Sequence, residues 1–183
     1  MAGSLNAYFG SAVHIIEEAV MKKQKGFSLI ELLIVVAIIL IIAAIAIPNL
    51  IKSKMAANQS GAAGTIRTIN SGEATYTSVC NQVGYSATLA ELNSGAICTA
   101  GANIIDAVLA AGNKSGYAFA EVGVAVGGFN TTFTDSATPL TLGSTGQNMY
   151  CSNQVGVIYY DPAGGACAVP ANGVPTATAV VLQ

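Results

Sequence analysis

One carboxylate stands at the start of the longest apolar run in this chain. Glu31 is followed by residues 32–47, none of which has a polar side chain. A charge within a membrane span costs about 2.5–3.5 kcal/mol on insertion scales, so such a group usually serves a function and has a partner. The chemistry open to Glu31 is therefore ion pairing in an apolar setting. The identity of the partner decides what this protein does.

A basic segment precedes the apolar run. Residues 22–26 contain Lys22, Lys23 and Lys25 and no acid. Lysines beside the start of an apolar span favour a cytoplasmic location for that end. We therefore expect the remainder of the chain to lie across the membrane, outside the cytoplasm.

The cysteines all follow the apolar run, at Cys80, Cys98, Cys151 and Cys167. An even number of cysteines outside the cytoplasm predicts disulfides. Three pairings are possible, and locality favours Cys80–Cys98 and Cys151–Cys167, each worth about 3 kcal/mol for loops of this length. No pair has a CxxC spacing, and the single histidine, His14, lies on the other side of the membrane, so a zinc site is a poor interpretation.

The composition is weakly charged. Charged residues make up 9% of the chain and apolar residues 52%, with a net charge of −2, whereas charged residues are about a quarter of a typical soluble domain. This charge excludes a basic nucleic-acid-binding domain as the default interpretation. From Ala56 onward small residues dominate, and such a surface suits packing against copies of the same chain.

An enzyme has little support in the sequence. We find no histidine outside the N-terminal region, no G-x-S-x-G motif and no pair of carboxylates at a suggestive spacing. Asn113-Lys114-Ser115-Gly116 superficially resembles a phosphate loop but lacks the flanking glycines of a Walker motif. A turn into a strand at Tyr117 is the better interpretation. We expect neither a cofactor nor a metal.

One long helix must position Glu31. The pattern predicts a helix from Phe27 to about Ser78, whose first half is apolar all round, as a membrane span must be. The second half is loosely amphipathic. Pro48 removes a backbone hydrogen bond, so a kink is expected there.

The pattern then changes to short elements. Helices are predicted at residues 88–93 and 103–111, with Thr88 and Asn103 as N-caps and Gly112 as the C-terminal stop. Strands are predicted at residues 117–126, 130–134, 147–151 and 155–160, the last two flanking a hairpin loop at 152–154. The tail after Asp161 should be irregular. The predicted fold class is α+β, with a long helical spine packed on an antiparallel sheet of about four strands.

The sequence Lys-Gly-Phe-Ser-Leu-Ile-Glu at residues 25–31, with Pro48 downstream, resembles the class III signal segment of bacterial type IV pilins and pseudopilins. The resemblance covers about thirty residues; the globular part is similar to the pilin fold by architecture only. It implies that a prepilin peptidase cuts after Gly26 and that Phe27 becomes an N-methylated terminus. It also implies that Glu31 pairs with the terminal amine of a neighbouring subunit. Pro48 lies where helices of the family kink or loosen.

This resemblance divides the chain into a leader, a polymerisation helix, an amphipathic half-spine and a pilin domain, which span residues 1–26, 27–51, 52–78 and 79–183, the last with a disulfide-closed tail. Met21 opens the basic segment. Residues 1–20 therefore either precede the natural start at Met21 or belong to a long leader.

The function implied is that of a structural subunit that polymerises with itself into a type IV pilus. Its implied partners are the prepilin peptidase/N-methyltransferase, an inner-membrane assembly platform and, before assembly, the membrane itself. The leader would be cytoplasmic and the globular domain outside the cytoplasm, and the product would be an extracellular pilus or a periplasmic pseudopilus.

Two alternatives stay open. A pseudopilin of a secretion or DNA-uptake system shares the N-terminal segment. Its major form has a calcium site in a C-terminal acidic cluster, whereas here only Asp135 and Asp161 follow residue 121. A secreted protein cleaved after Ala46 would explain Ala44-Ile45-Ala46, although Glu31 interrupts the apolar region and the run exceeds the usual length of a signal peptide.

Overall fold

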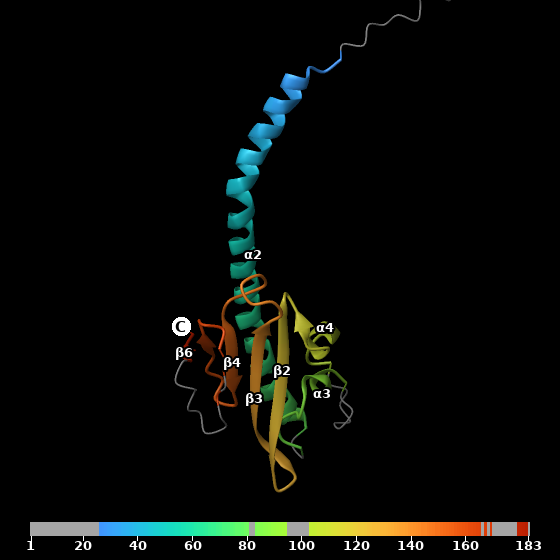
Figure 1. Cartoon of the computed structure of the whole chain (residues 1–183). Coiled ribbons are helices and arrows are strands. Elements are labelled where there is room, and N and C mark those ends of the chain that lie inside the picture. Colours follow the sequence, from blue (N-terminus) through green and yellow to red (C-terminus); the bar gives the residue numbers. More distant parts are fainter. Residues whose placement is uncertain are drawn as a thin grey trace, which may run out of the picture. The chain divides into compact units, whose positions relative to one another are not determined.

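The computed structural model describes residues 26–80, 83–94, 103–165, 167, 169 and 179–182. The chain divides into two compact units, Met1–Ala46 and Ile47–Gln183, and each is described by itself. The elements are α2 (Leu29–Val79), α3 (Leu89–Ser94), α4 (Ala107–Ala110), β1 (Asn113–Lys114), β2 (Tyr117–Val126), β3 (Phe129–Pro139), β4 (Met149–Asn153), β5 (Tyr159–Asp161) and β6 (Val180–Val181) (Figure 1).

The predicted spine is confirmed as α2, a helix of 51 residues. The assigned helix continues through Pro48 without interruption. Proline costs a helix one backbone hydrogen bond, yet the residues on both sides of Pro48 remain helical. The predicted leader, residues 1–26, lies outside the described residues except for Gly26.

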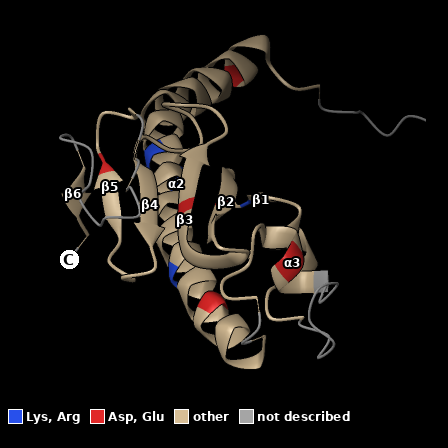
Figure 2. Ribbon diagram, turned by 90° about the horizontal axis from the view of Figure 1, so that it is seen from below, with Lys and Arg blue, Asp and Glu red and all other residues tan. Residues whose placement is uncertain are grey.

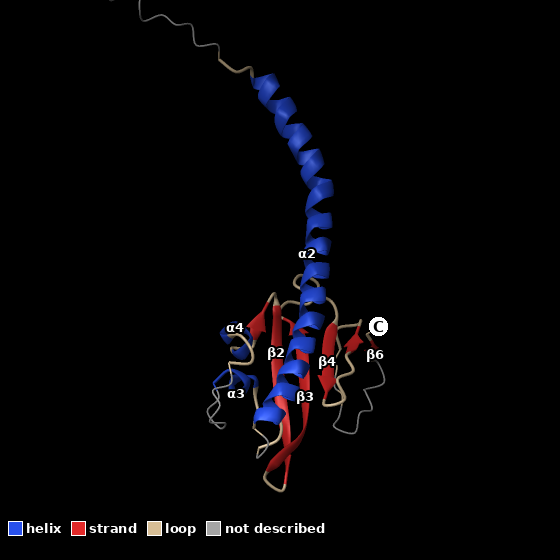
Figure 3. Cartoon of the chain, turned by 180° about the vertical axis from the view of Figure 1, so that it is seen from behind, coloured by secondary structure: helices blue, strands red, loops and turns tan. Residues whose placement is uncertain are grey.

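The sheet of the second unit is an antiparallel meander with the strand order β1-β2-β3-β4-β5-β6. The C-terminal half of α2 lies across one face of it (Figure 3). Strand side chains alternate between the two faces of a sheet, and in β2 the inward positions Tyr117, Phe119 and Glu121 are all buried. This confirms an α+β fold with a helical spine on an antiparallel sheet.

The core joins one stripe of α2 to the inner face of the sheet. Ile66, Ile69 and Tyr76 recur at helical spacing and are 0–1% exposed. They pack in one cluster with Leu92 and Leu109 and with inward residues of the sheet. Burying side chains of this size is worth about 1.5–3 kcal/mol each, so this stripe holds the spine on the sheet.

The sheet has six strands rather than about four. Asn113 and Lys114 form β1, which pairs with the start of β2 across Ser115 and Gly116. Both turn residues have positive φ, 50° and 78°, as a two-residue hairpin turn requires. The predicted turn is thus present, and it closes an additional hairpin. At the other edge, β6 places a short strand in a tail that we had predicted to be irregular.

The loop between β4 and β5 begins later than predicted. Ser152 and Asn153 were assigned to a hairpin loop, but they continue β4 and pair with Asp135 and Thr134. Ser152 also accepts a 2.9 Å hydrogen bond from the side-chain amide of Asn70. This long-range contact keeps residue 152 in the strand, and no local pattern encodes it. β3 likewise extends to Pro139 instead of ending near residue 134.

The second short helix also starts later than predicted. Asp106 is its N-cap, and its carboxylate accepts a 3.0 Å hydrogen bond from the Leu109 amide. Asn103, the predicted cap, has a φ of 34° and donates its amide hydrogen to the Asn93 carbonyl. Gly112 ends this region with a positive φ of 82°, as expected of a C-terminal stop. Thr88 immediately precedes α3, which confirms the predicted start of that helix.

Gly123 and Gly64 differ in how closely other parts of the chain approach them. A Cβ added at Gly123 in β2 would overlap the carbonyl oxygen of Ser86 and lie 3.0 Å from the Cα of Ala87, whereas one at Gly64 in α2 meets nothing within 4 Å. We expect Gly123→Ala to lower the free energy of unfolding by about 1–3 kcal/mol through overpacking. Gly64→Ala should raise it by about 0.5–1 kcal/mol because alanine favours helix.

Denaturant unfolding of the full chain in detergent measures both changes. Equal effects of the two substitutions would contradict this packing of β2 against residues 86–87.

Candidate functional site

The first turn of α2 holds the carboxylate that the sequence singled out. Residues 26–28 precede the helix, which begins at Leu29. The Leu32 amide donates a 3.2 Å hydrogen bond to the Ser28 carbonyl. Glu31 therefore lies where unpaired amides and the helix dipole favour a negative charge.

The apolar side chains of this segment have no cover within the described chain. Phe27 is 78% exposed and Leu29 is 80% exposed, and the large apolar residues from Ile30 to Ile51 are all exposed. α2 contains a window long and apolar enough to cross a membrane, and none of that window is buried. Exposed apolar surface on this scale needs a lipid or protein partner.

The predicted processing and assembly residues fall in two places. Gly26, Phe27 and Glu31 lie within one short segment at the start of α2, and Pro48 lies farther along the same helix. Among the residues that the structure describes, Lys114 and Asp106 form an ion pair at 2.7 Å, and no basic group pairs with Glu31.

One predicted disulfide is confirmed. Cys151 in β4 is bonded to Cys167, with a Cα–Cα distance of 5.7 Å, and it ties the segment after β5 to the sheet. Both cysteines are buried in a small cluster with Val169. Cys80 is buried at the end of α2 and takes part in a disulfide. Cys98, its predicted partner, lies outside the described residues, so that pairing stays a prediction.

The sequence analysis missed a group of buried carboxyls between α2 and the sheet. Glu73 of α2 is 0% exposed and Glu121 of β2 is 6% exposed. Both carboxyl groups contact the hydroxyl group of Ser86. Few charged residues occur anywhere in the domain (Figure 2). We had found no carboxylate pair at a suggestive spacing because these two belong to different elements. The spacing along each element could have indicated that both side chains are buried. Glu73 continues the buried stripe of Ile66 and Ile69, and Glu121 occupies an inward position of β2.

Burial shifts the acidity of two of these carboxyls. Burial, and then the neighbouring Glu73, raises the pKa of Glu121 to about 10. Burial raises the pKa of Asp135, on β3, to about 7. Asp135 and Glu121 are direct cross-strand partners on the inner face of the sheet. The described residues contain no group of three or more His, Cys, Asp or Glu side chains arranged to hold a metal ion.

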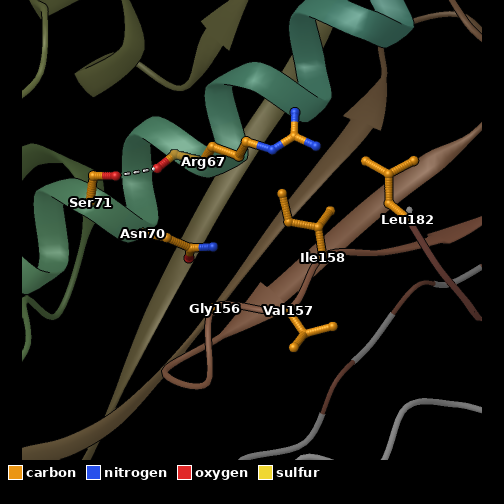
Figure 4. Close-up of a pocket in the computed structure, with 7 residues that line it drawn as sticks. All are labelled: Arg67, Asn70, Ser71, Gly156, Val157, Ile158 and Leu182. Atoms are coloured by element: carbon orange, nitrogen blue, oxygen red, sulfur yellow. Dashed lines mark hydrogen bonds between the residues drawn. The ribbon is translucent and has the colours of Figure 1, made fainter.

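A groove of about 470 Å³ lies between α2 and the segment before β5. Figure 4 shows Arg67 along one wall, with Ile158 and Leu182 opposite it. The Ser71 hydroxyl donates to the Arg67 carbonyl oxygen at 2.9 Å and is occupied within the helix. The lining combines one guanidinium group, the Asn70 amide and the Ser71 hydroxyl with aliphatic side chains, and it contains no nucleophile–base pair.

The N-terminal segment matches known proteins. Residues 21–47 match the family described as the prokaryotic N-terminal methylation motif. The chain is 39% identical over 71 residues to the type IV major pilin protein PilA of Myxococcus xanthus, over 35% of this chain and 32% of that protein. It is 58% identical over 40 residues to the type IV wide pilus major component PilA4 of Thermus thermophilus, over 22% of this chain and 30% of that protein.

The chain thus spans about a third of the length of the curated relatives that it matches. No solved structure matches it significantly. The resemblance of the N-terminal segment to type IV prepilins is confirmed, and the likeness to the named relatives covers only a minor part of the chain.

The Cys151–Cys167 bond should stabilise the second unit. We expect the double variant Cys151→Ser/Cys167→Ser to lose about 2–4 kcal/mol of unfolding free energy, because the closed loop restricts the unfolded chain. Denaturant unfolding of the oxidised variant measures this loss, with the oxidised wild-type protein as the reference. Peptide mapping without reductant should also recover Cys80 linked to Cys98. Unchanged stability, or a Cys80–Cys151 link, would contradict the assignment.

Proposed function

We propose that this chain is a prepilin, the structural subunit of a type IV pilus. One observation carries the proposal: an apolar helix with no cover in its own chain has a carboxylate in its first turn, within a segment that matches the N-terminal methylation motif. Both named relatives are major pilus components. These names support a pilus subunit with a structural role.

Cleavage after Gly26 would give Glu31 its partner. The cut creates a positively charged amine at Phe27, close to the apolar run. A charge buried alone in apolar surroundings is strongly unfavourable, whereas a paired charge is tolerated. Subunits stacked with the correct stagger would place the amine of one copy against Glu31 of the next. A wrong stagger would leave both charges unpaired, so the pair also sets the register of the filament.

Burial of the exposed apolar helix supplies the driving force for assembly. Before assembly the helix lies in the inner membrane, with the leader in the cytoplasm and the globular unit on the far side. In the filament, neighbouring helices replace lipid around the side chains from Phe27 to Ile51. The partners implied are other copies of this chain, the prepilin peptidase/N-methyltransferase and an inner-membrane assembly platform.

Substitution of Glu31 separates processing from assembly. We expect Glu31→Ala to be cleaved after Gly26 and methylated at Phe27, yet to give at least roughly tenfold less sheared filament, because removing one partner of a buried ion pair costs about 3–5 kcal/mol. Mass analysis of the mature N-terminus and filament yield are the two measurements.

Ser28→Ala is the matched control, since it changes the same turn without changing charge, and it should assemble normally. Normal filament yield from Glu31→Ala would refute the proposed pairing. A mature chain that begins at Ile47 would instead identify a secreted protein that has lost this helix.

A further inference from the structure

We propose that Glu73, Ser86 and Glu121 form a buried proton-binding site that fastens α2 to the sheet and weakens in alkaline solution. The three residues come from α2, from the segment between α2 and α3, and from β2. The site is therefore a direct polar link between the spine and the sheet. It is independent of the N-terminal segment and of the function proposed for it.

The Ser86 hydroxyl lies between two carboxyl groups but has a single hydrogen. The hydroxyl oxygen of Ser86 lies within hydrogen-bonding distance of Glu73 Oε1 and 2.5 Å from Glu121 Oε1. A serine hydroxyl has one proton to donate. It cannot donate to both carboxyls, so at least one carboxyl must donate to it. The Thr88 carbonyl oxygen, at 3.3 Å, competes for the same hydroxyl proton and does not lower this requirement.

The backbone identifies which carboxyl holds the proton. Glu73 accepts a 2.9 Å hydrogen bond from the Ser86 amide through Oε2, so this oxygen is an acceptor and not a donor. Glu121 Oε2 has no partner among the described residues. We therefore assign the chain of hydrogen bonds as the Glu121 carboxylic acid donating to Ser86, and the Ser86 hydroxyl donating to the Glu73 carboxylate.

The described residues around this site include acids and no cation. Asp135, the cross-strand partner of Glu121, is 2% exposed, and no side chain among the described residues donates a hydrogen bond to its carboxyl group. Burial, and then the charges of Glu91, Glu73 and Glu121, raise the pKa of Tyr76 on α2. Two ionised carboxyls in such a place repel each other and lack solvation. Protons are the ligands that remove this charge.

The pH dependence follows from the direction of these shifts. The pKa of Glu121 rises from 4.5 to about 10 on folding, with burial as the main cause. Between these values the folded protein holds a proton that the unfolded chain has released, so stability falls as the pH rises. The pKa of Asp135 rises from 3.8 to about 7, so its contribution to stability is already lost once the pH reaches about 7. Above about pH 7 the remaining dependence of stability on pH belongs to Glu121.

Unfolding of the full chain in detergent micelles tests the site between about pH 7 and pH 9. The unfolding equilibrium constant should rise up to about tenfold per pH unit in the wild-type protein, the value for release of one proton. Glu121→Gln places an amide donor against Ser86 that does not titrate, and it should abolish most of this slope.

Asp106→Asn is the matched control. In the wild-type protein, the hydrogen bond from Lys114 holds the pKa of Asp106 below its usual value, so Asp106 does not titrate between about pH 7 and pH 9. The variant should therefore keep the wild-type dependence of stability on pH.

Infrared spectroscopy provides a readout that a purely structural role would not change. Near neutral pH the wild-type protein and Asp106→Asn should show the carbonyl band of a buried carboxylic acid, and Glu121→Gln should show a weaker one. This measurement on the wild-type protein also holds if Glu121→Gln fails to fold. A stability independent of pH in this range, an unchanged slope in Glu121→Gln, or no carboxylic acid band would each overturn the proposal.

Discussion

The structure depends on one helix that meets two different environments. The first half of α2 is apolar all round and exposed, whereas the second half buries a stripe that includes Ile66 and Ile69 against the sheet. A helix of this length has no tertiary support of its own, because helices are stabilised mainly by the packing of an apolar face. The sheet supports the second half, whereas the apolar first half has no cover within the described residues.

Two of the few carboxyl groups in this chain lie on α2, one in each half of the helix. Glu31 lies at the start of the exposed apolar half of α2, and Glu73 lies on the buried stripe of the other half. Both carboxyls are in places where an unpaired charge is costly. Our two proposals satisfy them differently: an amine from another copy of the chain neutralises Glu31, and a shared proton accommodates Glu73 beside Glu121.

The elements that were predicted correctly are those with a strong local pattern. The long apolar run followed by amphipathic spacing predicted α2, and alternation predicted β2 within its observed bounds. The errors occurred where tertiary contacts decide. Ser152 stays in β4 through pairing with Asp135 and a hydrogen bond from Asn70, and β6 exists only by adding to the edge of β5. No neighbouring residues encode these contacts.

The sequence alone determined the spine, the chemistry at its start and the N-terminal resemblance, because apolar periodicity, a glycine, an aromatic residue and one carboxylate act over short distances along the chain. It also identified the Cys151–Cys167 pair as one local option, which the structure selected. Only the tertiary structure decided that Glu73 and Glu121 meet at Ser86. The physical reason is that an inward position commits a side chain to burial, but the fold alone determines which other buried groups it meets.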